Sequence, residues 1–137
     1  MGIVLDSSAL IGAERDAQPV SAVLAALEED HGETEIVLSS ITVVELEHGL
    51  HRADNPARSR RRRDYLDGEF AAIPVEPFTK EMGQTAAKLD ADARRTGRVI
   101  PFADLLIGAT ALYFDYAVGT RNFRHFQMVP GLRVLKL

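Results

Sequence analysis

Cysteine is absent from the sequence, so the chain can form neither disulfides nor thiolate metal sites. A metal ion bound to this chain must be held by oxygen or imidazole ligands, which favours a hard cation such as Mg²⁺ or Mn²⁺. Also absent are an apolar run of membrane-spanning length and a basic leader before Asp6. These absences predict a protein that has no membrane anchor and is located in the cytoplasm.

The sequence has no excess of positive charge, because 16 Lys and Arg residues stand against 20 Asp and Glu residues. This balance argues against a surface that attracts nucleic acid everywhere, although a local basic patch is still compatible with RNA binding. A length of 137 residues with 46% hydrophobic content suits one globular domain spanning residues 1–137. Net charge therefore does not decide the function.

Short apolar runs alternate with segments that have helical patterns. The expected strands are Gly2–Leu5, Glu35–Leu38, Ile73–Val75, Tyr116–Gly119 and Leu132–Leu135. A first helix is expected to begin after Ser7 or Ser8. The later helices are expected at Val20–Glu29, from Ser39 or Ser40 to Leu50, at Asn55–Phe70, at Thr79–Arg95, and from Pro101 to about Phe114. This alternation predicts an α/β fold with a mostly parallel sheet covered by helices on both faces.

Asp104 is the only charged residue in the segment IPFADLLIGATAL, which covers residues 100–112. A helix that is apolar all round is generally buried, and a buried carboxylate is costly unless it is paired or binds a metal. A bound cation would remove this cost. The alternative is a partly solvated acid in the first helical turn, where the helix dipole stabilises it.

Asp6 directly follows a short apolar strand. In an open α/β sheet, ligands bind in the crevice beyond the carboxyl ends of the strands, which is where Asp6 is expected. The alternative is that Asp6 caps the following helix, but Ser7 or Ser8 can cap that helix equally well. The interpretation of Asp6 as a ligand-binding acid is supported by Asp104, a second acid for which a bound cation is expected.

A second apolar helix carries two glutamates in the segment SSITVVELEHGL, which covers residues 39–50. Helical spacing places Glu45 on the same face as Ile41 and His48, whereas Glu47 lies beside Val43. Periodicity alone does not choose between the two, and either can be an ordinary solvent-facing residue.

Four segments taken together, LDSSALI, SSITVVELEHGL, IPFADLLIGATAL and GTRNF, resemble the signature of the PIN-domain ribonucleases. Their order and spacing are similar to those of the VapC toxins of bacterial toxin–antitoxin pairs, and the resemblance extends from Val4 to Leu135. It implies a three-layer α/β/α sandwich with a mostly parallel central sheet. It also implies an endoribonuclease that hydrolyses structured RNA, such as transfer or ribosomal RNA.

The resemblance further implies that Asp6, Glu45 and Asp104 are the catalytic, metal-binding acids, which selects Glu45 over Glu47. Three converging carboxylates repel one another, and Mg²⁺ or Mn²⁺ relieves this repulsion while leaving positions for water and a phosphate oxygen. The expected reaction is attack by water, with one metal ion or a weakly held second one. Asp6 and Asp104 are then the principal ligands, and Glu45 positions or deprotonates the water.

The same resemblance assigns supporting roles to small polar residues. Ser8 is implied to orient the site by hydrogen bonding, and Thr120 and Asn122 match the segment that contributes its fourth corner. No Asp or Glu follows Asp115, so this corner is the neutral Asn122, aided by His125 or water. A tightly held second metal ion is therefore not expected.

Arginines are the remaining candidates for contact with substrate. Arg121 and Arg124 flank Asn122, and we expect them to bind the substrate by positioning phosphate. The dense run Arg58–Arg63 has three interpretations: a solvated helix with ion pairs to the acids that follow it, an RNA contact or an antitoxin contact.

The resemblance also implies partners. A small cognate antitoxin of the VapB type is expected to insert an extended tail near the acidic pocket, and the chain is expected to form a homodimer. Two other functions are alternatives. A phosphoaspartate enzyme of the D-x-D type needs an acid where this chain has Ser8, and the neutral Asn122 is compatible with a catalytically silent module that binds RNA or protein.

Overall fold

A five-stranded parallel sheet forms the centre of the computed structural model, which describes all of residues 1–137. The strands are β1 (Gly2–Leu5), β2 (Glu35–Ser39), β3 (Val75–Glu76), β4 (Ala117–Thr120) and β5 (Val134–Lys136). Their order is β3-β2-β1-β4-β5, so the first strand of the chain is the central strand of the sheet. The predicted parallel sheet is confirmed, with β3 and β5 each displaced by about two residues from the expected ranges.

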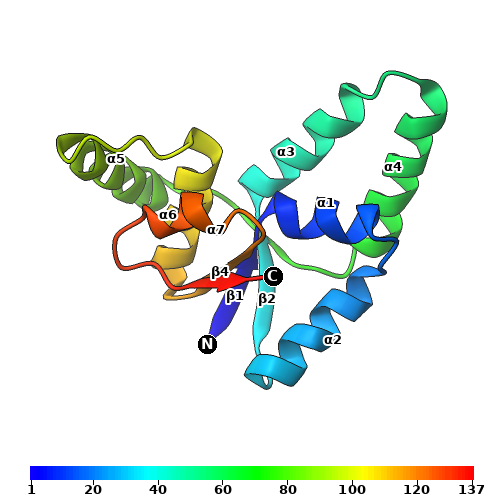
Figure 1. Ribbon diagram of the computed structural model, residues 1–137, viewed down its shortest axis with the longest axis horizontal. Helices are drawn as coiled ribbons and strands as arrows, with labels where there is room; N and C mark the ends of the chain where they lie inside the picture. Colours follow the sequence, from blue (N-terminus) through cyan, green and yellow to red (C-terminus); the bar gives the residue numbers. More distant parts are fainter.

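Helices cover both faces of the sheet. They are α1 (Ser7–Arg15), α2 (Val20–His31), α3 (Ser40–His51), α4 (Pro56–Glu69), α5 (Lys80–Arg95), α6 (Phe102–Phe114) and α7 (Phe123–Gln127). Figure 1 shows α1 to α4 on one side of the strands and α5 to α7 on the other, which confirms the three-layer sandwich. The short helix α7 was not predicted, because five residues are too few to show a helical period.

The central strand β1 is buried along its whole length and contributes to two cores. Ile3 and Leu5 pack into one core with Leu10 of α1. Val4 points to the opposite face and packs into another core with Ile107 of α6. This alternation is the two-residue period of a strand between two helical layers. Packing on both faces of the sheet fixes the position of β1, and therefore the position of Asp6 at its end.

The chain turns from strand to helix immediately after β1 and β2. Asp6 is extended, with φ −88° and ψ 173°, and its carboxylate accepts the Ala9 N–H over 3.2 Å as the N-cap of α1. The expectation that Ser7 or Ser8 would serve equally well as the cap was therefore wrong, because both residues already lie inside the helix. At α3, Ser39 is the N-cap and accepts the Ile41 N–H. These short connections hold the first turns of both helices close to the sheet.

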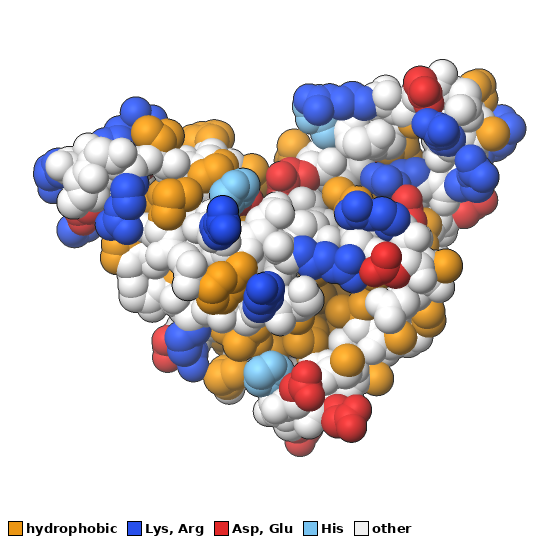
Figure 2. All heavy atoms as spheres, viewed as in Figure 1, with side chains coloured by type: hydrophobic (Ala, Val, Ile, Leu, Met, Phe, Trp, Pro, Cys, Tyr) orange, Lys and Arg blue, Asp and Glu red, His pale blue; other side chains and the backbone are white.

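Two arms rise from the sheet and leave a notch between them, as Figure 2 shows on the surface of the molecule. In the same orientation of Figure 1, one arm consists of α5 and α6, and the other consists of α3 and α4. The carboxyl ends of β1 and β4 lead toward the base of this notch, so residues that follow these strands are brought together there. None of the helices has the length and apolar character needed to cross a bilayer.

Candidate active site

Asp6 is a buried carboxylate that is held by three hydrogen-bond donors. Its side chain accepts the Ser8 hydroxyl hydrogen over 2.8 Å, the Thr120 hydroxyl hydrogen over 2.8 Å and the Ala9 N–H over 3.2 Å. Asp6 is only 1% exposed and has no Lys or Arg partner. Burial raises the pKa of Asp6 above its usual value, the hydrogen bonds lower it, and nearby Asp104 raises it further.

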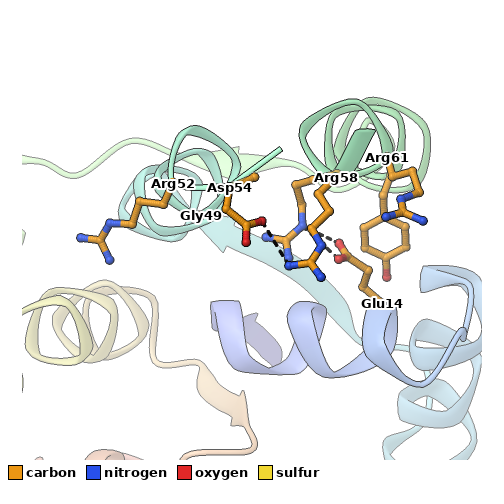
Figure 3. A pocket seen from close by; sticks show the side chains of 9 residues that line it. Glu14, Gly49, Arg52, Asp54, Arg58 and Arg61 are labelled. Carbon is orange, nitrogen blue, oxygen red and sulfur yellow. Dashed lines mark hydrogen bonds and ion pairs between the residues drawn. The ribbon is translucent and has the colours of Figure 1, made fainter. Parts of the chain in front are cut away.

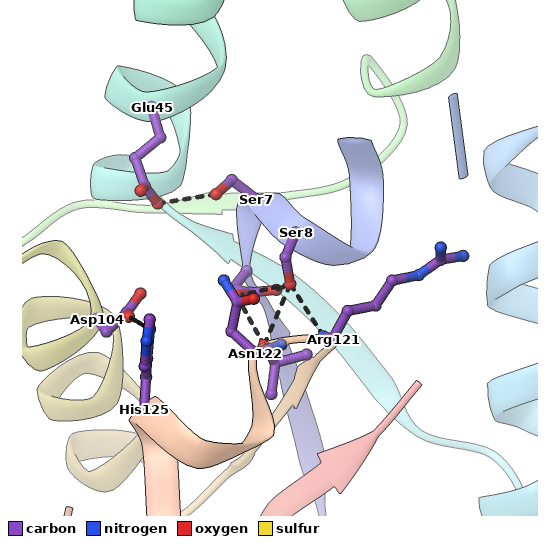
Figure 4. A network of polar contacts seen from close by, with 9 residues as sticks. Ser7, Ser8, Glu45, Asp104, Arg121, Asn122 and His125 are labelled. Carbon is purple, nitrogen blue, oxygen red and sulfur yellow. Dashed lines mark hydrogen bonds and ion pairs between the residues drawn. The ribbon is translucent and has the colours of Figure 1, made fainter. Parts of the chain in front are cut away.

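The two hydroxyls that bind Asp6 are themselves oriented by the backbone between β4 and α7. The Arg121 N–H donates to Ser8 Oγ over 2.9 Å, and the Asn122 N–H donates to Thr120 Oγ1 over 2.8 Å. Each hydroxyl accepts a backbone hydrogen, so its own hydrogen is available to the carboxylate. The structure thus brings Ser8, Thr120 and Asn122 to Asp6, as Figure 4 shows.

Glu45 and Glu47 have different environments, although periodicity left them equivalent. Glu45 is half-buried and accepts the Ser7 hydroxyl hydrogen over 3.0 Å. Burial raises its pKa, and the charges of Asp104 and Asp6 raise it further. Glu47 instead binds the guanidinium of Arg63, which lowers the pKa of Glu47. Only Glu45 therefore belongs to the acidic cluster.

Asp104 lies in the first turn of α6 and is only 7% exposed. Its Oδ2 lies 2.7 Å from Nδ1 of His125, which comes from the short helix α7. Burial raises the pKa of Asp104, and His125 lowers it in part. The prediction of a buried acid is confirmed, and the alternative of a partly solvated acid is not. From the sequence, His125 was expected to assist Asn122, and the structure shows that His125 contacts Asp104 directly.

Ser7 and the contact between His125 and Asp104 were missed at the level of sequence. Ser7 was considered only as a helix cap, yet it binds Glu45, which lies 38 residues away in the chain. A hydroxyl next to a candidate acid at the end of a strand was the available signal. No local pattern pairs His125 with Asp104, because α7 was not expected.

Asp6, Glu45 and Asp104 together concentrate negative charge at the base of the notch. The charge of Asp104 raises the pKa of Asp6, and the charges of both aspartates raise the pKa of Glu45. No Lys or Arg side chain pairs with any of them, and His125 is the single basic partner of Asp104. This donor chemistry fits a hard divalent cation. As the side chains stand, however, no three acidic or histidine residues form a closed set of metal ligands. Binding a cation would require the carboxylates to move together.

The two arginines that flank Asn122 have different environments. The side chain of Arg121 runs away from Asp6 across Gly12, and its Nη2 donates to Asp16 Oδ2 over 2.9 Å. Its guanidinium is therefore held outside the acidic cluster, and its contribution to the site is the backbone N–H described above. Arg124 is exposed and lies in a shallow pocket that His125 also lines. Its expected contact with phosphate stays a prediction.

Comparison with known proteins places this geometry in a family. The PIN domain model matches residues 3–131 of the chain. The chain belongs to the PIN-domain family. This PIN domain is 39% identical to the VapC ribonuclease Y4jK of Sinorhizobium fredii, over 97% of this chain and 95% of the relative. It is 32% identical to Ribonuclease VapC19 of Mycobacterium tuberculosis, over 85% of this chain and 86% of the relative.

A solved structure shows the same fold. It contains VapBC2 from Rickettsia felis bound to a DNA fragment from its promoter, and it matches this PIN domain with a TM-score of 0.86. The match is 20% identical in sequence and covers 100% of this chain and 99% of the solved chain. The predicted family and fold are therefore confirmed, and the relatives of this PIN domain include VapC ribonucleases.

Proposed function

We propose that this PIN domain is an endoribonuclease toxin that hydrolyses phosphodiester bonds of structured RNA with the aid of Mg²⁺ or Mn²⁺. The observation that carries the proposal is the cluster of Asp6, Glu45 and Asp104. These carboxylates come from three different elements, all have raised pKa values, and none has a Lys or Arg partner. The names of the VapC relatives support RNA as the substrate class.

In this proposal Asp6 and Asp104 hold the cation, and Glu45 acts on water. A bound Mg²⁺ or Mn²⁺ would stabilise negative charge on the scissile phosphate and make water more acidic. Glu45 has a raised pKa, so its carboxylate is suited to accept a proton from the attacking water. Attack on phosphorus breaks the bond to the leaving oxygen. Ser8 and Thr120 keep Asp6 in a fixed orientation, and His125 does the same for Asp104.

The proposed partners are an antitoxin of the VapB type and a second copy of this chain. The solved VapBC2 complex supports the first, because its toxin chain has the same fold as this one. A basic side chain in the antitoxin tail would satisfy the unpaired carboxylates by charge-assisted hydrogen bonds and thereby compete with the cation. Inhibition of RNA cleavage by a peptide of the cognate tail tests this step.

The proposal is tested by cleavage of labelled transfer RNA and ribosomal RNA fragments with Mg²⁺ or Mn²⁺, with chelator and with Asp104→Asn. Asp115→Asn is the matched control, because the Asp115 side chain is fully exposed at the end of α6. We expect cleavage by the unchanged chain and by Asp115→Asn, and no cleavage with chelator or with Asp104→Asn. Cleavage that survives both chelator and Asp104→Asn would contradict the assigned site.

A folded chain that binds RNA but never cleaves it would favour the interpretation as a catalytically silent module. Mapping the cut ends in total cellular RNA after a pulse of expression identifies the target.

A further inference from the structure

A line of polar side chains extends from Glu45 along α3. Glu45, His48 and Arg52 are spaced by three and four residues, so they lie on one face of the helix. Arg52 Nε donates to His48 Nε2 over 3.0 Å, which holds the guanidinium on this face. Seven residues at 1.5 Å each place Arg52 about 10 Å along the helix axis from Glu45. The line begins at the acidic cluster and ends in a cation.

Arg52 differs from three nearby arginines of α4 because no carboxylate neutralises it. Three arginines of α4 have carboxylate partners within 3.2 Å, in the pairs Arg58–Asp54, Arg62–Glu14 and Arg63–Glu47. Arg52 makes no ion pair, and its hydrogen bond to His48 Nε2 uses only its Nε–H group. Figure 3 shows its side chain directed away from α4, at the rim of a pocket that Arg58 and Arg61 also line.

The acidic cluster by itself repels the substrate, because an RNA backbone carries one negative charge per nucleotide. A cation beside the cluster offsets this repulsion and holds the strand in register. An exposed arginine is suited to this contact, since its planar guanidinium binds phosphate through two parallel hydrogen bonds. Arg52 is the unneutralised arginine that shares a helix face with Glu45.

We propose that Arg52, held in place by His48, binds a backbone phosphate of the RNA two or three nucleotides from the bond that is cut. This inference rests on the proposed ribonuclease function and adds a substrate-binding position to it. The spacing follows from the distance of about 10 Å to Glu45 and a rise of about 3.4 Å per nucleotide in a stacked strand.

RNA is favoured over an acidic protein as the occupant because of where Arg52 lies. It shares a helix face with Glu45, so a strand whose phosphate is at the acidic cluster passes along this face of α3. Of the arginines of α4, Arg58, Arg62 and Arg63 are already paired with carboxylates within the chain. An acidic protein contact at Arg52 is the alternative outcome of the experiment below.

The test compares Arg52→Gln with the matched control Arg60→Gln. Arg60 is exposed on α4, has no ion-pair partner and lies two residues from both Arg58 and Arg62, so it is on the opposite face of α4. RNA binding is measured against salt in an Asp104→Asn background, which binds without cutting. We expect Arg52→Gln to lower the slope of log Kd against log salt by about 0.7, and Arg60→Gln to leave it unchanged. Arg52→Lys, which keeps the charge, should restore most of the slope.

Cleavage kinetics provide a second readout with Asp104 intact. We expect Arg52→Gln to raise KM several-fold and to leave kcat within about twofold, because a phosphate contact away from the cut bond stabilises bound substrate and transition state alike. Neutral methylphosphonate groups, placed one at a time in the RNA, locate the contact. One of them, two or three nucleotides from the cut, should weaken binding to the unchanged chain and have no further effect with Arg52→Gln.

The outcomes separate this inference from the proposed function. If the unchanged chain cleaves RNA but Arg52→Gln alters neither the salt slope, KM nor the methylphosphonate pattern, the phosphate contact is wrong and the ribonuclease proposal stands. If no RNA is cleaved, the ribonuclease proposal fails, and the salt slope still decides whether Arg52 contacts RNA. If Arg52→Gln weakens only the binding of an acidic protein partner, this surface is a protein contact and the inference is overturned.

Discussion

Thr120 Oγ1 lies 2.8 Å from Asp6 Oδ2, although 114 residues separate the two in the chain. The contact follows from the pairing of β1 with β4, in which Leu5 is opposite Gly119. Asp6 follows Leu5 and Thr120 follows Gly119, so the two residues lie side by side at the carboxyl edge of the sheet. Parallel pairing of two buried strands thus delivers a hydroxyl to a buried carboxylate without any local signal between them.

We expect Thr120→Val to impair both stability and activity. The change removes a donor from buried Asp6 and leaves the Asn122 N–H without its acceptor, which should cost about 1–3 kcal/mol in the free energy of unfolding by urea. The Thr120 hydrogen bond lowers the pKa of Asp6, so its loss should move the acid limb of the pH–rate profile to higher pH. Thr120→Ser is the control and should retain the profile. An unchanged profile for Thr120→Val would show that Asp6 does not titrate in this limb.

Glu45→Gln should become more stable than the unchanged chain as the pH rises in the presence of chelator. The pKa of Glu45 is raised by folding, so its protonated form favours the folded state. This contribution is fully present below the ordinary pKa of 4.5 and is lost as the pH rises through the raised value. Glu47→Gln should show the opposite sign, because Arg63 lowers the pKa of Glu47. Its contribution to stability is present above 4.5 and is lost as the pH falls. Tm measured from well below pH 4.5 to neutral pH checks both, and equal trends would refute the assignment.

The same two variants separate the glutamates by activity. We expect Glu45→Gln to reduce RNA cleavage by about 100-fold or more, as is usual when a group that transfers a proton is removed. Glu47→Gln should retain cleavage near that of the unchanged chain, since Glu47 binds Arg63 outside the acidic cluster. Initial rates at saturating Mg²⁺ measure both. Similar losses in the two variants would argue against the role given to Glu45.

Gly12 and Arg121 should be coupled in stability. A Cβ on Gly12 would lie 2.4 Å from the guanidinium carbon of Arg121, so Gly12→Ala must displace that side chain from Asp16. In an Arg121→Ala background the same change meets no guanidinium and should stabilise α1 by about 1 kcal/mol, because Ala is a better helix former than Gly. A double-mutant cycle in urea measures the coupling, and strict additivity would contradict it. Arg121→Ala alone should retain cleavage, since it keeps the backbone N–H that binds Ser8.

Much of the framework was predictable because burial has a local signature. The apolar run of β1 indicated that Asp6 lies at the carboxyl edge of a buried sheet, and the lone charge of Asp104 in an apolar helix indicated a buried acid. Both predictions agree with the structure. The same reasoning gave the parallel sheet, since short apolar strands separated by helices cannot pair in another simple way.

The rest depended on contacts between distant segments. Glu45 is distinguished from Glu47 in the structure by Arg63, which belongs to another helix. The direction of Arg121 depends on the space above Gly12 and on Asp16, neither of which a pattern around Asn122 reveals. For the run Arg58–Arg63, the ion pairs show that part of its charge is already used within the chain.

The central place of β1 in the sheet has a consequence for synthesis of the protein. The strand β1 is made before its two neighbours in the sheet, and one of them, β4, begins only at Ala117. A polypeptide that stops short of this residue has an open edge on β1 and offers Asp6 no hydroxyl from Thr120. Products of translation that stop before Ala117 therefore lack the Thr120 contact that completes the surroundings of Asp6.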